Sequence, residues 1–303
     1  MNADSSGRPA GSRYRSIYRP GLFDDQLIVV TGAGSGIGRA AAHELAQLGA
    51  TIAMVGRNRE KLEAVQAEIA DNGGRASLHT CDIRDETAVN QTFEAIIAEH
   101  GRIDALINNA GGQYQALLET ISFKGWDAVV RNNLHGGFLC MQAAFRLYMR
   151  DHGGSIVNMV ADMWAGMPGM AHSGAARAGM LNLTETAACE WGHFGIRVNA
   201  VAPGWIGSSG FDKYDEETKK LIRTLPPKVP LQRFGTEAEI ASAMVFLLSE
   251  SAAFITGSCI RIDGGVPNTV PGFPMLPLAH PSRACQAYEG FHLASRPKVL
   301  EGL

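Results

Sequence analysis

The sequence is poor in the features that mark several classes of protein. Its five cysteines are far apart and include no Cys-x-x-Cys pair. We therefore expect neither a metal site nor a disulfide framework, and a cytoplasmic, reducing location suits the chain best. The formal net charge of −3 provides no basic surface for nucleic acid or an anionic membrane. No apolar run approaches the ~20 residues that a membrane span requires.

Glycine, by contrast, is abundant, with 35 residues, and short apolar runs alternate with longer stretches of helical period. Apolar strands that are each followed by a helix indicate a parallel sheet covered on both faces. Right-handed crossovers make that sheet doubly wound, so we predict a single-domain α/β protein with a Rossmann fold. The expected strands are 27–30, 51–55, 76–79, 105–107, 155–158, 197–201 and 258–262, and the expected helices are 38–48, 59–72, 86–100, 126–149, 175–193 and 237–248.

The two ends differ from this middle part. Residues 1–21 mix Ser, Gly, Pro and Arg without helical periodicity, which predicts a flexible arm, with a mitochondrial presequence as the alternative. Residues 22–266 form the predicted catalytic domain, in which 205–232 interrupts the alternation and is expected to be a substrate lid. Residues 267–303 hold six of the 13 prolines and predict an irregular tail over the body or onto a neighbouring subunit.

The first strand runs directly into a glycine-rich turn, Thr31–Gly38, and a helix follows. Glycines let backbone N–H groups approach a pyrophosphate at the positive end of that helix. The spacing departs from strict G-x-G-x-x-G, because Ile37 stands where the last glycine would be. The strand before the turn and the helix after it nevertheless predict a dinucleotide site. Its expected contacts are Gly32, Ser35, Gly36, Ile37 and Gly38.

The end of the second strand bears on which dinucleotide binds. An NAD site of this kind commonly places an acid there, on the ribose hydroxyls. This chain has Gly56-Arg57-Asn58-Arg59 and no acid. Because a guanidinium suits a 2′-phosphate, Arg57 favours NADP(H) over NAD(H), and the alternative is that Arg57 is a solvated surface residue.

Further motifs follow in order along the chain. They are Cys81-Asp82-Ile83, Asn108-Asn109-Ala110-Gly111, Asn133-Leu134, Ile196–Asn199 and Ala202-Pro203-Gly204. With the glycine turn, they resemble the short-chain dehydrogenase/reductase family over about residues 24–266. The resemblance implies a homodimer or homotetramer assembled through the two long helices.

The same resemblance implies roles for several residues in binding the cofactor. Asp82 and Ile83 would flank the adenine, and Asn109, Ala110 and Gly111 would line the cofactor side of the central strand. Pro203, Gly204 and Ile206 would face the nicotinamide.

The chain departs from the family where the catalytic groups are expected. Most members carry Ser and then Tyr-x-x-x-Lys, but here the strand is followed by Val160-Ala161-Asp162 without the Ser. Alignment on Ala178-Gly179 puts Arg177 at the Lys position and Ser173 at the Tyr position. A phenol of pKa ~10 can protonate a ketone, whereas a serine hydroxyl needs a separate base. Ordinary alcohol–ketone interconversion is therefore disfavoured.

Reduction of a double bond conjugated to a thioester requires chiefly hydrogen-bond donors to an oxyanion. Ser173 is a suitable donor, and Arg177 would hold the cofactor ribose. Gly111-Gly112-Gln113, Gly153–Asn158 and His172–Gly179 resemble the peroxisomal trans-2-enoyl-CoA reductase and 2,4-dienoyl-CoA reductase branch. Bacterial proteins similar to this branch are often assigned to citronellol or citronellal oxidation.

Two more side chains, His172 and Asp162, have two interpretations each. His172 either relays a proton or is a helix-start histidine bonded to backbone. Asp162 either delivers a proton or caps a loop. Asn133 resembles the family's helix Asn, which holds a water through a distorted backbone, and Trp164 and Met167 are the expected lining of an acyl pocket.

The sequence thus leads to one hypothesis and two alternatives. The hypothesis is an NADP(H)-dependent oxidoreductase that reduces an enoyl-CoA-type thioester as its small-molecule substrate. One alternative is an alcohol or aldehyde (citronellol-like) or 3-oxoacyl oxidoreductase, with His172 or Asp162 replacing the Tyr. The other is a catalytically decayed, cofactor-binding subunit or sensor.

Overall fold

The computed structural model describes residues 13–269, 276, 286–295 and 297–301. The described chain forms a 7-stranded sheet in the order β3-β2-β1-β4-β5-β6-β7, with every neighbouring pair parallel. The predicted doubly wound fold and all its expected strands are confirmed. The strands are β1 Leu27–Thr31, β2 Thr51–Gly56, β3 Arg75–Thr80, β4 Ala105–Asn108, β5 Gly154–Met159, β6 Ile196–Pro203 and β7 Cys259–Ile262.

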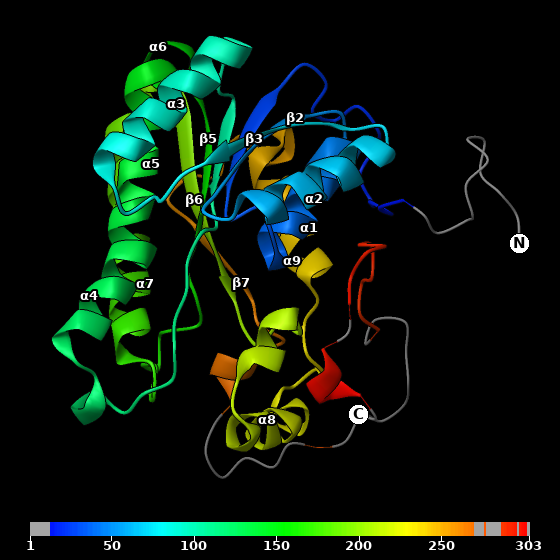
Figure 1. The fold of residues 1–303 in the computed structure, drawn as a ribbon, viewed down its shortest axis with the longest axis vertical. Helices are drawn as coiled ribbons and strands as arrows, with labels where there is room; N and C mark the ends of the chain where they lie inside the picture. Colours follow the sequence, from blue (N-terminus) through cyan, green and yellow to red (C-terminus); the bar gives the residue numbers. More distant parts are fainter. Residues whose placement is uncertain (1–12, 270–275, 277–285, 296, 302–303) are drawn as a thin grey trace, which may run out of the picture.

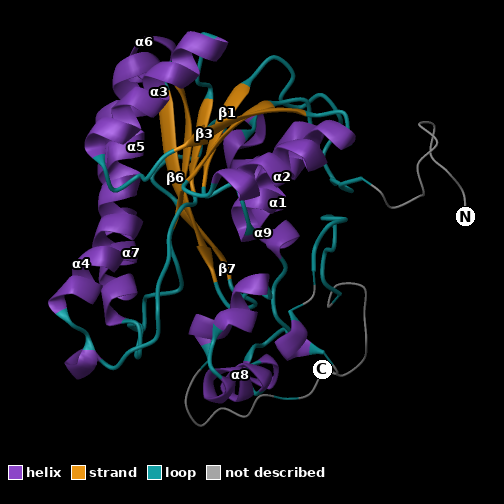
Figure 2. Ribbon diagram, in the orientation of Figure 1, coloured by secondary structure: helices purple, strands orange, loops and turns teal. Residues whose placement is uncertain are grey.

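Helices cover both faces of the sheet (Figures 1 and 2). One face packs against α1 Gly36–Gln47, α2 Arg59–Asp71 and α9 Glu237–Leu248, and the other against α3 Glu86–His100, α5 Gly136–Ala144 and α7 Ala171–Trp191. Alternate residues of β1 enter opposite cores: Ile28 and Val30 on the α1 side, Leu27 and Val29 on the α3 side. The inner strands β1, β2 and β4 are largely apolar because both of their faces are buried, whereas the edge strands β3 and β7 also carry polar residues such as His79 and Arg261.

The helix expected over 126–149 is a longer and less regular element. It runs without a break from Phe123 to His152 and contains two π-helical turns. Its parts are α4 Phe123–Val130, the π turn Arg131–His135, α5, the π turn Phe145–Met149 and α6 Arg150–His152. Single π turns are frequent at functional sites, and the first of these carries Asn133.

The carboxyl ends of β1 and β4 meet at the point where the chain leaves the sheet in opposite directions. The Thr31 hydroxyl oxygen accepts hydrogen bonds from the N–H groups of Asn109 (3.0 Å) and Ala110 (3.0 Å). The hydroxyl donates to the Ile107 carbonyl at 3.2 Å, and the Asn109 amide donates to the Thr31 carbonyl at 3.0 Å. Ligands of open α/β sheets bind at such a switch point.

The segment predicted as a lid, 205–232, contains α8 Glu216–Arg223. The end of the C-terminal tail packs against this helix: Val299 and Leu300 form a small core with Ile222, and Arg223 Nε donates to the Val299 carbonyl at 2.8 Å. The described part of the tail is irregular, as predicted, apart from short 3₁₀ turns.

The N-terminal arm differs from the expected flexible segment over residues 13–21. Tyr14 is buried, donates to the Glu44 carboxylate at 2.9 Å and stacks on Phe291 of the tail with ring centroids 5.7 Å apart. The arm and the tail therefore cover α1 together, because Tyr14 of the arm and Phe291 of the tail pack against each other over this helix. Residues 1–12 lie outside the described residues. Among the described residues, none of the helices has both the length and the apolar character needed to cross a bilayer.

Glu44 makes this contact sensitive to pH. Burial raises the pKa of Glu44 to about 7, although hydrogen bonds from Ser16 and Tyr14 oppose the shift. Because the folded-state pKa lies above the unfolded value, Glu44 destabilises the fold progressively as pH rises from about 4.5 to 7. Glu44→Gln should therefore raise the free energy of unfolding by roughly 2 kcal/mol at pH 8 and change it little at pH 4.5.

Urea denaturation at the two pH values measures this difference. The exposed Glu94→Gln on α3 is the matched control and should show no such pH dependence. An equal effect of Glu44→Gln at both pH values would contradict the assignment.

Candidate active site

A cavity of about 610 Å³ opens at the carboxyl ends of β1, β2 and β4, beside the Thr31 junction. It is the crevice in which this type of sheet binds its ligand. Of the residues predicted to bind a cofactor, Gly32, Ser35, Ile37, Arg57, Ile83, Asn109, Ala110 and Gly111 line it. Sequence reasoning missed Val55, Lys61, Leu62, Cys81, Asn132 and Ser208, which also line it.

The glycine turn presents the N-terminus of α1 to this cavity. Ser35 is the N-cap residue, and its side chain makes no capping hydrogen bond. The N–H groups of the first turn are therefore left for a ligand, and the positive end of the helix suits a pyrophosphate. Gly38 lies behind the turn, where a Cβ would collide with the Asn109 amide and the Gly32 carbonyl. Gly36, with φ of +60°, completes the turn.

Positive charge lies at the β2 end of the cavity. Arg57, just after β2, is exposed and forms no hydrogen bond or ion pair within the described chain. Lys61, in the first turn of α2, lines the same wall. Asp82, expected beside the adenine, is instead bound by the Arg84 guanidinium (Nε to Oδ1 2.9 Å), which lowers the pKa of Asp82 to about 2. Its two neighbours, Cys81 and Ile83, line the cavity, and Asp82 itself does not.

Ser173 lies fully buried in the first turn of α7 and donates a hydrogen bond to Gln113 Oε1 at 2.6 Å. Gln113 belongs to the loop after β4, sixty residues earlier in the chain. We did not predict it as a site residue, and the signal for it was its place in the Gly111-Gly112-Gln113 run.

Asn133 holds the same loop. Its amide nitrogen donates to the carbonyls of Gly112 (2.7 Å) and Val129 (2.8 Å), and its Oδ1 accepts from the Gly112 N–H at 3.1 Å. The backbone distortion expected at Asn133 is present as the π turn Arg131–His135. Asn133 thus positions the segment that carries Gln113.

Arg177, one turn beyond Ser173, is a buried cation. Its Nη1 donates to the Met159 carbonyl at 2.5 Å, and its Nη2 approaches Gly111 so closely that a Cβ there would lie 2.6 Å away. Burial lowers the pKa of Arg177 to about 10, which leaves it charged at neutral pH. Its Nε has no partner, and no carboxylate pairs with it in the described chain. A buried charge without a counter-charge favours an electron-rich ligand beside it.

In the described chain, neither the His172 side chain nor the Asp162 side chain forms a hydrogen bond with the Ser173 hydroxyl. The His172 ring is fully buried, and its Nδ1 accepts from the Ser173 N–H at 2.9 Å, as expected of a helix-start histidine bonded to backbone. Its Nε2 has no partner within the described residues, and the edge of the ring meets the Tyr114 ring at 4.6 Å. The charges that act on the Asp162 carboxyl are Asp263 and Arg261, and burial raises its pKa. Asp162 therefore belongs to the β7 side of the site.

The residues expected against the nicotinamide follow β6. Pro203 ends this strand, and the Gly204 N–H donates to the Ile262 carbonyl at 3.0 Å, which pulls the turn against β7. Ile206 is buried and lines a second cavity of about 560 Å³ together with Trp205 and Asp263.

A third, apolar pocket of about 370 Å³ lies against the start of α7. Met167 lines it, as predicted, together with Met163 and Leu118. Trp164 differs from its prediction: it is 46% exposed and lies over the Arg261 guanidinium at 5.2 Å, because the cation attracts the face of the indole.

Residues 32–267 match the family model described as enoyl-(acyl carrier protein) reductase. The chain belongs to the short-chain dehydrogenase/reductase family. It is 42% identical over 247 residues to a probable 2,4-dienoyl-CoA reductase of Bacillus subtilis (80% of this chain, 97% of that protein). It is 38% identical to a 3-oxoacyl-[acyl-carrier-protein] reductase of Staphylococcus aureus (78% and 96%). The structure of a citronellol catabolism dehydrogenase from Pseudomonas aeruginosa is 56% identical, with a TM-score of 0.76 and coverage of 84% and 99%.

The short-chain dehydrogenases/reductases use NAD(P)(H), and the site fits such a cofactor. The open helix end and the unpaired Nε of Arg177 are features that a bound dinucleotide would satisfy, and the close packing at Gly38 holds the turn that presents the helix end. The chain is thus an NAD(P)(H)-dependent oxidoreductase.

Proposed function

We propose that this oxidoreductase uses NADPH to reduce the carbon–carbon double bond of an enoyl thioester such as an enoyl-CoA. The observation that carries the proposal is the Ser173–Gln113 pair, which stands where most members of the family have a tyrosine. The hydroxyl and the carboxamide offer hydrogen bonds without a phenol, and the uncompensated charge of Arg177 is one helical turn away. This chemistry suits an oxyanion more than a ketone that must be protonated.

The reaction balances with these groups. A nicotinamide held in the cavity would supply the hydride that bonds to the β-carbon of the substrate. The electron pair of the double bond then moves onto the thioester oxygen. The Ser173 hydroxyl, which donates its one proton to Gln113 Oε1 in the structure, would turn to donate to this oxygen, and the Gln113 amide nitrogen would donate beside it. The electron pair returns to the α-carbon as it takes a proton from water, which leaves the saturated thioester.

The apolar pocket supports an acyl chain as the other part of the substrate. It adjoins Ser173, because Gly174 of the next position lines it together with Met163, Met167 and Leu118. A chain in this pocket would leave its thioester end beside the Ser173 hydroxyl. The resemblance to a protein named as a 2,4-dienoyl-CoA reductase supports the same substrate class.

Oxidation or reduction of an alcohol or aldehyde with an apolar chain is the second candidate. The 56% identity to a citronellol catabolism dehydrogenase favours it. The structure also brings one phenol to this region that sequence order had not indicated, since Tyr114 contacts His172. Tyr114 could then act as the acid that Ser173 cannot be.

We also propose NADP(H) rather than NAD(H) as the cofactor, because Arg57 and Lys61 line the adenosine end of the cavity and the one acid nearby, Asp82, is held by Arg84. The free thiols of the described cysteines suit a reducing cytoplasm.

Phe138 and Leu147, exposed along the α4–α6 helix, suit a homo-oligomer formed through the long helices.

The proposal is tested by following NADPH at 340 nm with trans-2-enoyl-CoA, and NADP⁺ with citronellol and other alcohols. We expect turnover of the enoyl thioester and none of the alcohols. Ser173→Ala should lower kcat at least ~10-fold, since a donor to the oxyanion is lost. Tyr114→Phe, a change in the adjoining loop that removes only a hydroxyl, is the matched control and should keep the activity.

Three other outcomes would count against the proposal. Turnover of alcohols that is lost in Tyr114→Phe would establish the second candidate. An unchanged rate in Ser173→Ala would remove Ser173 from the mechanism. Tight NADPH binding without turnover on either panel would mean a cofactor-binding protein without catalysis.

The cofactor preference has its own test. Arg57→Ala should weaken NADPH binding about 10-fold and NADH binding less than about 2-fold, because only NADPH carries the 2′-phosphate that a guanidinium binds. Nucleotide fluorescence titration measures both dissociation constants. Arg59→Ala is the control, since Arg59 is exposed two residues away and pairs with Glu63 at 2.8 Å. An equal loss of NADPH and NADH binding in Arg57→Ala would contradict the 2′-phosphate contact.

A further inference from the structure

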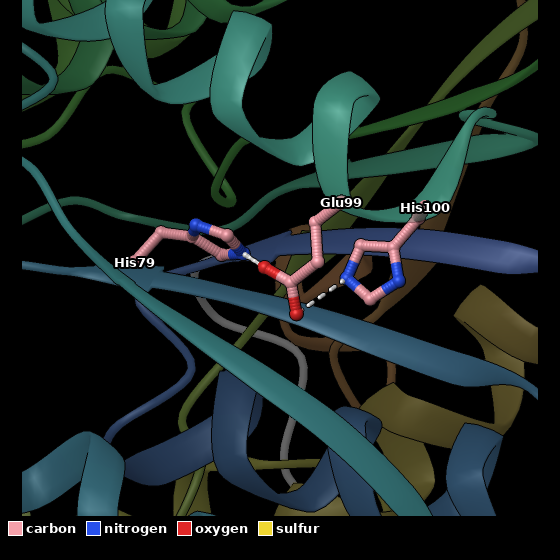
Figure 3. A group of neighbouring side chains, drawn as sticks. All are labelled: His79, Glu99 and His100. Carbon is pink, nitrogen blue, oxygen red and sulfur yellow. Dashed lines mark ion pairs between the residues drawn. The ribbon is translucent and has the colours of Figure 1, made fainter.

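Two histidines and a glutamate converge on the far edge of the sheet, outside the cofactor cavity (Figure 3). His79 lies on β3, which is an edge strand, and Glu99 and His100 are the last two residues of α3. A ligand atom from each of the three side chains lies within 4.8 Å of the other two. The proposed reductase chemistry uses none of these groups.

The distances between these atoms are those of a metal cage. His79 Nε2 lies 3.8 Å from Glu99 Oε2, and His100 Nε2 lies 3.4 Å from Glu99 Oε1. The hydroxyl oxygen of Ser77 lies 3.0 Å and 2.8 Å from the two Nε2 atoms. In a tetrahedral zinc site with bonds of about 2.05 Å, neighbouring ligand atoms are about 3.3 Å apart. The four separations, 2.8 to 3.8 Å, lie on either side of this value, with one Glu99 oxygen facing each imidazole.

The fold also orients the ligands. Ser77 and His79 are two residues apart on one strand and so face the same side, toward α3. Ser77 is buried and holds both imidazole rings with their Nε2 atoms turned toward one another. The rings are only 10% and 17% exposed, whereas Glu99 is 52% exposed. An ion would enter from the solvent on the Glu99 side.

We propose that His79, His100 and Glu99 bind one Zn²⁺ ion, with the fourth position taken by the Ser77 hydroxyl or by water. Two imidazoles and one carboxylate suit zinc, whereas Ca²⁺ and Mg²⁺ require mainly oxygen ligands. The ion fastens the edge strand β3 to the end of α3. Sequence spacing did not reveal the site, because 19 residues separate His79 from Glu99 and the ligands meet only in the fold.

The full-length protein, treated with chelator and then dialysed, provides the test. Competition titration with a zinc indicator should give one zinc site per chain with a dissociation constant below ~10 µM. Addition of Zn²⁺ should raise the melting temperature by at least about 3 °C, and Ca²⁺ or Mg²⁺ should not. In His79→Gln/His100→Gln both effects should be lost, and the exposed Glu99→Gln should weaken the affinity at least ~10-fold.

His152→Gln/His193→Gln removes the same number of histidines from exposed positions elsewhere and is the matched control. It should keep the zinc site and the thermal shift. The proposal is overturned if wild-type protein lacks the site, or if the two double variants lose zinc to the same extent, which would mean non-specific binding to surface histidines. If the first double variant fails to fold, Glu99→Gln decides alone, and unchanged affinity there overturns the proposal.

Discussion

The hydroxyl of Thr31 joins the carboxyl ends of β1 and β4, and the rest of the site depends on this junction. It is buried, and it takes up two backbone N–H groups that would otherwise lack partners at the point where the sheet divides. Asn109 completes the junction from β4 and leaves room only for glycine at position 38 of α1. The cavity that receives the cofactor opens directly beside these groups.

The loop that follows β4 connects this junction to the proposed reacting groups. Asn133 fixes the loop at Gly112, Arg177 packs against it at Gly111, and Gln113 meets the Ser173 hydroxyl. One short segment thus touches the cofactor cavity at its start and the proposed oxyanion site at its end. Asn133 contacts this segment from a π turn, a departure from α-helical geometry that is frequent at functional sites.

The fold could be predicted from the sequence because both faces of the inner strands are buried, which makes β1, β2 and β4 largely continuous apolar runs. The glycine turn could also be predicted, since its position directly after the first strand places Ser35 and Ile37 at the cavity that they line. Contacts between distant segments could not be read in this way. Gln113 meets Ser173 across 60 residues, and Trp164 turned to Arg261 although its loop position suggested the acyl pocket.

The most direct test of the proposed reduction is the fate of a labelled hydride. NADPH carrying deuterium at the transferred position of the nicotinamide would be incubated with trans-2-enoyl-CoA, and the saturated product analysed by NMR. The account predicts one deuterium at the β-carbon and none at the α-carbon, which takes its hydrogen from water. Deuterium at the α-carbon, or a saturated product without deuterium, would contradict it.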